Sequence, residues 1–385
     1  MSDETDRESP VEETADGESP LDHRASDLHV RSRADRGEIP SLHGLRALAI
    51  IFVLVSHTSE TFNLKPGLAK SLFDLLPTGA FGVNVFFVMS GFLITRIVLD
   101  YSAKDRSLKT FFARRALRLV PALWFFVGVT VVLGALHVFS IPALAAMSAM
   151  FFVWDYSPAT LHVWWLGHTW SLAIEEQFYI LWAPFLKKVG PRRGAQMAAF
   201  LIVFIPLLRI ASYVASPDPN SYLRIRGDSM LHTRGDVLMV GCLIALMWEK
   251  PRFQAWVQRL TKPPLLFADF GYLLVSSYLI NHYHGKWSQT VGNSADAFAI
   301  AFVMVYAVVH YESLLGRFLN HRWIVQVGLM SYSLYLWQEL FLTNFNKTIT
   351  GEFPLNLVCT VACATFSYYL VEIPFLNLRR RVTTG

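Results

Sequence analysis

An arginine and a histidine in the first long apolar stretch of the sequence are the first candidates for chemistry. Arg46 and His57 lie 11 residues apart in HGLRALAIIFVLVSH. In an α-helix this spacing places them on nearly the same face, roughly 16 Å apart. Ionisable side chains inside an apolar helix are costly and therefore indicate function. The alternative is an interfacial arginine together with a buried histidine that has a structural hydrogen bond.

A carboxylate in a second apolar stretch is the next candidate. In HTWSLAIEEQFYILW, residues Ser171, Glu175 and Tyr179 recur every four positions and form one stripe, whereas Glu176 is rotated by about 100°. Glu175 is therefore predicted to face the interior, where a carboxylate suits proton transfer or the orientation of a histidine. A structural ion pair between helices is the alternative.

Three arginines cluster in ARRALRLVP. Arg114 and Arg118 share a helix face, and Arg115 lies between them in sequence. Planar guanidinium groups match phosphate oxygens, so the cluster predicts a site for a phosphate-rich cosubstrate. Ordinary basic flanking of a membrane helix is the alternative.

Two further segments carry polar groups among apolar ones. HTRGDVLMVG contains Arg234 and Asp236, and SYSLYLWQE contains Tyr335 and Trp337. We take these four as candidate substrate-binding residues. The alternatives are a mutual ion pair of Arg234 with Asp236, and an aromatic belt at the membrane interface for the second segment.

The composition excludes a soluble globular protein. Of 385 residues, 53% are hydrophobic and 16% are charged, and the mean hydropathy is +0.37. Too few polar groups are present to cover a soluble surface. The predicted fold class is an all-α integral membrane protein. Its three cysteines lie in apolar stretches and suggest neither a disulfide framework nor a metal site, and no nucleic-acid-binding motif occurs.

Ten stretches are long and apolar enough to cross a bilayer. Lys and Arg gather in every second connection, which places both termini in the cytoplasm. The short apolar stretch 141–154 would reverse this alternation if it crossed, so it is predicted to be re-entrant or interfacial. The ten predicted crossings are 43–62, 80–99, 119–137, 169–186, 195–214, 232–248, 264–281, 294–310, 323–345 and 353–375.

The N-terminal tail differs from the rest of the chain. Residues 1–40 contain 12 Asp and Glu against 5 Lys and Arg, a net charge of −7, with few apolar residues. This tail is predicted to be disordered and cytoplasmic, and it lacks the apolar core of a signal peptide. Residues 41–376 form the predicted membrane domain, followed by a basic cytoplasmic C-terminus at 377–385.

Seven segments in this order resemble the acyltransferase-3 family of bacterial membrane O-acyltransferases. The resemblance implies a ten-helix bundle that moves an acyl group from acyl-CoA to a hydroxyl group, commonly on a sugar. It also implies that Arg46 and His57 match the catalytic pair, that Glu175 matches a motif carboxylate, and that the three arginines match a basic cytoplasmic motif. The matching segments are Arg46 with His57, GVNVFFVMSGFLI, RRALRLVP, WSLAIEEQFY, TRGDVLMVG, SYSLYLW and VEIPF.

Two features qualify the resemblance. Many relatives have histidine where this chain has Gln338, so we expect no proton transfer at that position. The chain also ends too soon for the soluble esterase-like domain that some members carry. General likeness to actinobacterial enzymes favours a macrolide antibiotic or its sugar as the acceptor, with a cell-surface polysaccharide or other glycan as the alternative.

The predicted reaction needs acyl-CoA as cosubstrate and no permanently bound cofactor. His57 would take the proton of the acceptor hydroxyl, or carry the acyl group transiently. Glu175 would orient His57, and Arg114, Arg115 and Arg118 would bind the phosphates of CoA. A transporter is the remote alternative, although the interrupted helices in matching halves that many transporters have are not evident.

Overall fold

The structure is a computed structural model that describes residues 39, 41–62, 67, 75–216, 218, 221, 227–283 and 285–381. The predicted disordered tail, apart from residue 39, lies outside the described residues. Within the described ranges the regular elements are all helical, and none is a strand. The all-α fold class is therefore confirmed.

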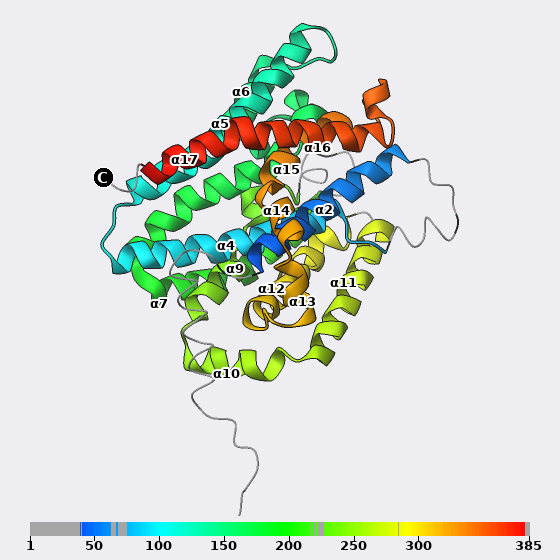
Figure 1. Cartoon of the computed structure of the whole chain (residues 1–385). Helices are drawn as coiled ribbons and strands as arrows, with labels where there is room; N and C mark the ends of the chain where they lie inside the picture. The colour runs from blue at the N-terminus through cyan, green and yellow to red at the C-terminus, as the bar shows by residue number, and fades with distance from the viewer. Residues whose placement is uncertain are drawn as a thin grey trace, which may run out of the picture. The chain divides into compact units, whose positions relative to one another are not determined.

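The described part of the membrane body consists of α-helices arranged as Figure 1 shows. Short 3-10 turns precede α7, and π-helical turns lead into α12 and join α16 to α17. The α-helices are α2 (Leu42–Thr61), α4 (Gly79–Ala103), α5 (Leu108–Ala135), α6 (Ala143–Met150), α7 (Thr169–Ala215), α9 (Leu231–Met247), α10 (Pro251–Leu260), α11 (Pro263–Tyr283), α12 (Asn293–Val309), α13 (Leu314–Leu319), α14 (Arg322–Leu329), α15 (Ser331–Phe341), α16 (Leu355–Ser367) and α17 (Ile373–Arg381).

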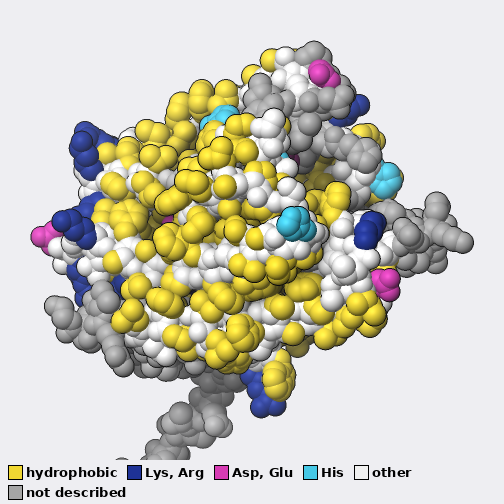
Figure 2. Space-filling view, turned by 90° about the horizontal axis from the view of Figure 1, so that it is seen from above, with side chains coloured by type: hydrophobic (Ala, Val, Ile, Leu, Met, Phe, Trp, Pro, Cys, Tyr) yellow, Lys and Arg dark blue, Asp and Glu magenta, His cyan; other side chains and the backbone are white. Residues whose placement is uncertain are grey.

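The number of membrane crossings differs from the predicted ten. Among the described residues, 7 helical segments can cross a membrane by length and composition, or 8 if α9 and α10, which meet at a bend of 113°, form one span. The multi-pass class is supported, but the count of ten is not confirmed. Hydrophobic side chains cover most of the face seen in Figure 2, and the charged side chains lie toward its margins. That distribution fits a body surrounded by lipid.

The helix α7 accounts for part of the difference. Its 47 residues include Gly190, whose φ of 78° and ψ of 174° are not helical. A Cβ added at Gly194 would lie 2.5 Å from the Leu186 side chain, so the segments on either side of Gly190 turn back against each other. The halves of α7 correspond to the predicted stretches 169–186 and 195–214.

The predicted crossing 323–345 is broken into α14 and α15, of 8 and 11 residues. Neither is long enough to cross about 30 Å of hydrocarbon. All residues from Ser331 to Leu340 are buried. The stretch is therefore surrounded by protein, which explains its apolar composition without a membrane crossing. The helix α6, within 141–154, has 8 residues and is likewise too short to cross, as predicted.

Small residues bring the backbones of α2, α4 and α9 into contact. A Cβ added at Gly91 would lie 1.9 Å from the carbonyl oxygen of Leu238, and one at Gly241 would lie 2.0 Å from that of Val88. A Cβ at Gly82 would lie 2.4 Å from the carbonyl oxygen of Ala49. Such close approaches are how membrane helices gain packing energy without a hydrophobic driving force.

Replacing Gly91 with alanine should lower the unfolding temperature, because the new methyl group cannot fit against the α9 backbone. Overpacking of this kind costs about 1–3 kcal/mol. Gly128→Ala in α5 is the matched control, since no neighbouring atom lies within 4 Å of its added Cβ. Thermal unfolding in detergent measures both variants. Equal unfolding temperatures for Gly91→Ala and the unchanged protein would contradict the packing described here.

Candidate active site

The buried helix α15 lies at the centre of the candidate site. It packs against α2, α5, α16 and the 3-10 turn Trp164–Leu166 that precedes α7 (Figure 1). Its apolar neighbours hold it in place, while its polar side chains reach α2 and α7. Consecutive residues of α15, Gln338 and Glu339, each hydrogen-bond a histidine.

His57 is held by Gln338. The imidazole Nδ1 and the amide Oε1 of Gln338 form a short hydrogen bond, and the His57 and Trp164 ring centroids lie 6.0 Å apart. A carbonyl oxygen only accepts, so Nδ1 carries the hydrogen and Nε2 keeps its lone pair. The His57 side chain is half-buried. Gln338 therefore orients His57 through a neutral amide.

Glu175 does not occupy the role predicted for it beside His57. Its Oε1 accepts a hydrogen bond of 2.8 Å from Ser90, and its Oε2 lies 3.6 Å from Arg115. The stripe read from the sequence does face the interior, since Ser171 is hydrogen-bonded to another helix at 2.6 Å. The prediction that this stripe faces the interior was right. The prediction that Glu175 orients His57 was wrong, because the hydrogen-bond partner of His57 is Gln338 of α15.

Arg115 is already paired within the protein. Its Nε donates to Glu176 at 2.6 Å, and its guanidinium lies 3.5 Å from the centroid of the Tyr179 ring. Its side chain is 19% exposed. Arg115 thus forms an ion pair between α5 and α7, the structural alternative considered for Glu175. Its predicted phosphate contact stays a prediction. Glu176, predicted to turn away from the interior, takes part in this pair.

Two other arginines lack such a partner. Among the described residues, Arg46 and Arg118 form no hydrogen bond or ion pair at contact distance, although each is within electrostatic range of the other and of Glu372. Glu372 belongs to the VEIPF segment and accepts a hydrogen bond of 2.9 Å from Ser333. Arg114 donates to the Tyr101 hydroxyl at 2.9 Å. Arg46 and Arg118 are therefore the guanidinium groups best placed to bind a ligand anion.

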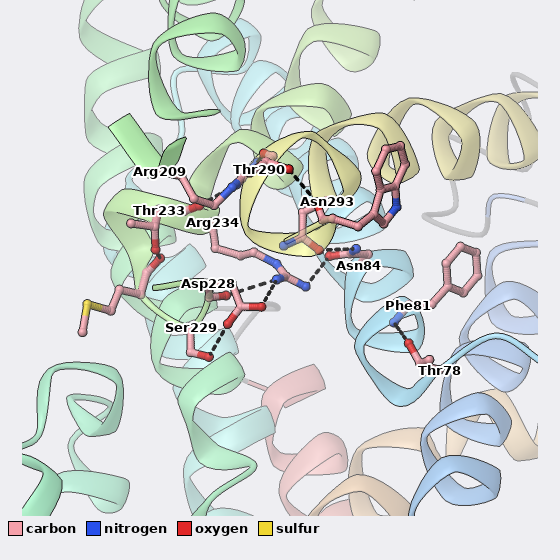
Figure 3. A network of polar contacts seen from close by, with 12 residues as sticks. Thr78, Phe81, Asn84, Arg209, Asp228, Ser229, Thr233, Arg234, Thr290 and Asn293 are labelled. Carbon is pink, nitrogen blue, oxygen red and sulfur yellow. Dashed lines mark hydrogen bonds and ion pairs between the residues drawn. The ribbon is translucent and has the colours of Figure 1, made fainter. Parts of the chain in front are cut away.

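Arg234 and Asp236 do not pair with each other. Arg234 donates to Asn84 at 2.8 Å and lies 3.6 Å from a carboxylate oxygen of Asp228 (Figure 3). Asp236 instead pairs with Arg209 of α7 at 3.0 Å, with both side chains 1% exposed. The mutual ion pair considered from the sequence is wrong, because residues two apart on a helix do not face each other.

Sequence reasoning missed Arg209, although a lone arginine inside the apolar stretch 195–214 was a visible signal. Besides Asp236, it donates to the backbone oxygens of Thr233 and Thr290 and to the Ser294 hydroxyl. In Figure 3 the Arg209 side chain lies beside Thr233 and Thr290. These bonds tie α7, α9 and the start of α12 together.

Tyr335 and Trp337 lie inside the bundle, so the interfacial belt considered for them is wrong. The Tyr335 hydroxyl is 2.6 Å from the Ser171 hydroxyl and donates to the backbone oxygen of His168 at 3.0 Å. Trp337 packs on Phe126, with ring centroids 5.6 Å apart. Both lie near the start of α7. Their predicted role in substrate binding stays a prediction.

A second histidine was also missed. His168, immediately before α7, donates through Nδ1 to Glu339 at 2.9 Å, and its backbone N–H reaches the same carboxylate oxygen at 3.0 Å. The sequence did carry a signal: His168 and Glu339 are ionisable residues in two of the segments discussed above, HTWSLAIEEQFYILW and SYSLYLWQE. In the described part of the chain, no group of three His, Cys, Asp or Glu side chains could hold a metal ion.

Together these observations define a multi-pass helical membrane protein with a histidine site inside the bundle and a separate cluster of arginines. Residues 39–372 match the family model described as an acyltransferase domain. The chain belongs to this family, the acyltransferase-3 family, as its motifs indicated.

Several curated relatives are bacterial O-acetyltransferases. O-acetyltransferase OatA of Staphylococcus aureus is 30% identical over 87% of this chain and 57% of the relative. Putative peptidoglycan O-acetyltransferase YrhL of Bacillus subtilis is 29% identical over 89% and 56%. Peptidoglycan O-acetyltransferase OatA of Listeria monocytogenes is 27% identical over 89% and 56%. The chain thus spans about half the length of these relatives. No solved structure matches it.

Asp236→Ala should strongly destabilise the protein, because Arg209 would remain buried without its partner. Breaking a buried ion pair in this way costs about 3–5 kcal/mol. Asp100→Ala is the control, since its pair with Lys104 is on the surface, with the carboxylate 44% exposed, and exposed pairs contribute about 0–1 kcal/mol. The measurement is thermal unfolding of purified protein. A similar loss in both variants would contradict the assigned pairing.

Proposed function

We propose that this protein is a membrane O-acetyltransferase that acetylates a hydroxyl group of a cell-surface glycan. Membership of the acyltransferase-3 family supports the transfer reaction. The names of the relatives, which refer to peptidoglycan O-acetylation, support a glycan acceptor over the macrolide predicted from general likeness. The observation that carries the proposal is a half-buried histidine, oriented by Gln338, on the same helix as an unpaired arginine.

The donor in this proposal is acyl-CoA, bound through its phosphates at the arginine cluster. Arg46 and Arg118 have guanidinium groups without contact partners among the described residues, and Arg114 retains an unpaired Nε. Guanidinium forks bind phosphate with two parallel hydrogen bonds. Because Arg46 lies about three turns of α2 before His57, a donor anchored there would place its thioester toward the histidine.

The cluster would open to the cytoplasm. Lys187 donates to the backbone oxygen of Arg106 at 2.6 Å, and Arg96 lies 3.5 Å from Glu249. The α4–α5 connection, the turn in α7 and the end of α9 therefore lie on one side of the body. These connections are rich in Lys and Arg, which favours the cytoplasmic side. We infer on the same basis that both termini are cytoplasmic and that ten stretches cross or enter the membrane.

In the proposed reaction, His57 acts as the base. Its Nε2 takes the proton of the acceptor hydroxyl as the oxygen attacks the acyl carbonyl carbon. The carbon–sulfur bond then breaks, and the thiolate receives the proton from His57. Gln338 keeps the imidazole in the tautomer that this step requires, because its carbonyl oxygen accepts the Nδ1 hydrogen.

His57→Gln should leave a folded protein that binds CoA but transfers acetyl groups about 10²-fold to 10⁴-fold more slowly, the usual contribution of an acid–base group. Glutamine keeps one hydrogen bond and cannot accept the proton. The measurement is release of free CoA thiol with a glycan acceptor. Near-normal turnover by this variant would reject His57 as the base, and trapped acyl-enzyme in the unchanged protein would make His57 an acyl carrier.

Arg118→Ala should raise the apparent KM for acetyl-CoA about 10-fold while leaving the KM for the glycan within about 2-fold, since one charge-assisted phosphate contact is lost. Arg118→Lys should restore binding only in part, because lysine keeps the charge without the planar fork. Arg252→Ala is the control, an exposed arginine at the start of α10 outside the cluster. An unchanged donor KM in a stable Arg118→Ala protein would contradict this donor site.

A further inference from the structure

The pair formed by His168 and Glu339 has no role in the reaction described so far. The two side chains are 1% and 7% exposed. One carboxylate oxygen of Glu339 accepts both the Nδ1 hydrogen and the backbone N–H of His168. The backbone bond caps the start of α7, and a neutral amide such as glutamine would serve that purpose equally well. Capping therefore leaves the charge of Glu339 unexplained.

The charge of Glu339 determines the state of His168. Among the described residues, His168 is the partner that can carry a positive charge at contact distance from this carboxylate. A bare carboxylate inside a membrane bundle costs several kcal/mol. A protonated imidazole makes the pair neutral overall. The geometry therefore favours His168 as an imidazolium ion, with hydrogens on both ring nitrogens.

The second nitrogen of His168 has nothing to donate to. Its Nε2 is buried and has no hydrogen-bond partner among the described residues. The amide nitrogen of Gln338 and the indole nitrogens of Trp164 and Trp337 are buried and unpaired in the same way. Each unsatisfied buried donor costs about 1–3 kcal/mol, and such groups call for a ligand or a catalytic role. All of these are donors, so the missing ligand is a hydrogen-bond acceptor.

Two of these donors, those of Gln338 and Trp164, belong to residues that lie next to His57. Gln338 holds His57, and the Trp164 ring lies 6.0 Å from the His57 ring. His168 follows Trp164 by four residues, in the turn where the Gly167 N–H bonds the Trp164 carbonyl oxygen. His168 and Trp337 both pack against Phe126, at 5.3 and 5.6 Å between ring centroids. The two histidines are thus held by neighbouring residues of α15, Gln338 and Glu339. Trp164, the ring neighbour of His57, lies four residues before His168.

We propose that the His168 imidazolium, held by Glu339 and assisted by the Gln338 amide, binds the carbonyl oxygen of the acyl group during transfer. This inference rests on the proposed acyl-transfer function. As the acceptor oxygen bonds to the carbonyl carbon, negative charge develops on the carbonyl oxygen and meets these N–H donors. The carbonyl re-forms as the carbon–sulfur bond breaks. His168 keeps its proton throughout, and His57 moves the proton from the hydroxyl to the sulfur.

The division of labour follows from the different partners of the two histidines. A carboxylate partner stabilises an imidazolium ion, whereas an amide partner fixes a tautomer without adding charge. His168 is thereby suited to donate a hydrogen bond to an oxyanion, and His57 to accept a proton. Donors fixed in advance around a developing oxyanion are often the largest contribution to acyl-transfer catalysis.

Kinetics of Glu339→Gln and His168→Gln in the full-length protein test the proposal. Glu339→Gln keeps an oxygen for the α7 cap and removes the charge. Both variants should lose about 10²-fold to 10³-fold in kcat, the cost of one oxyanion donor, with KM for donor and acceptor within about 3-fold because the contact forms only in the transition state. Tyr332→Phe is the matched control: it removes a buried hydrogen bond from α15 to Leu119 and should keep its turnover.

A purely structural pair predicts the opposite pattern. Folding and yield would fall in Glu339→Gln and His168→Gln, while the protein that survives would turn over at nearly the normal rate. That result would overturn the proposal, and so would a loss confined to KM. Solid-state NMR of protein with ¹⁵N-labelled histidine gives a measurement independent of turnover. An imidazolium signal at neutral pH that disappears in His168→Gln supports the proposal, and a neutral His168 ring overturns it.

Failure of the proposed function gives a different result. If the unchanged protein acetylates glycan in cells but not from purified acetyl-CoA, the donor assignment fails, and the acetyl content of glycan from cells carrying each variant decides the role of His168. If the unchanged protein acetylates no glycan in cells, the proposed function fails, and the oxyanion role of His168 fails with it. In that case an imidazolium NMR signal would establish only the charge of the pair.

Discussion

A charged side chain inside this bundle needs a partner in the protein or in a bound ligand, because the surrounding hydrocarbon offers none. Arg209 with Asp236, Arg115 with Glu176, and His168 with Glu339 meet this requirement across helices that are distant in sequence. Each pair fixes the relative position of the two segments that it joins. Elsewhere, at the α4–α9 contact, glycines let the two helix backbones approach each other closely.

The same constraint separates structural from functional groups. Side chains whose hydrogen-bonding capacity is used inside the protein, such as Arg115 and Arg209, hold helices together. A buried polar group without a hydrogen-bond partner destabilises the protein, and a bound ligand can remove this cost by supplying the partner. Arg46 and Arg118, which are half-buried and have no contact partner among the described residues, favour an anion site. The buried, unpaired N–H groups of Gln338 and Trp164 next to His57 favour a ligand that accepts hydrogen bonds. The two sites are joined by α2, which carries both Arg46 and His57.

The sequence could predict features that depend on one helix at a time. The four-residue stripe of Ser171, Glu175 and Tyr179 faces the interior as expected, because helix periodicity is local. The choice of partner is not local, which is why Gln338 rather than Glu175 was found beside His57. The break between α14 and α15 was hidden for a similar reason: hydropathy does not distinguish burial in protein from burial in lipid.

Transfer of a labelled acetyl group in a purified system would show whether this protein is the proposed O-acetyltransferase. Protein in lipid vesicles would receive acetyl-CoA with a ¹³C-labelled acetyl group together with defined peptidoglycan fragments, and the fragments would be analysed by mass spectrometry. We expect the glycan to gain the mass of one labelled acetyl ester and an equal amount of free CoA thiol to be released. Release of labelled acetate with no labelled glycan, or no reaction at all, would contradict the proposed function.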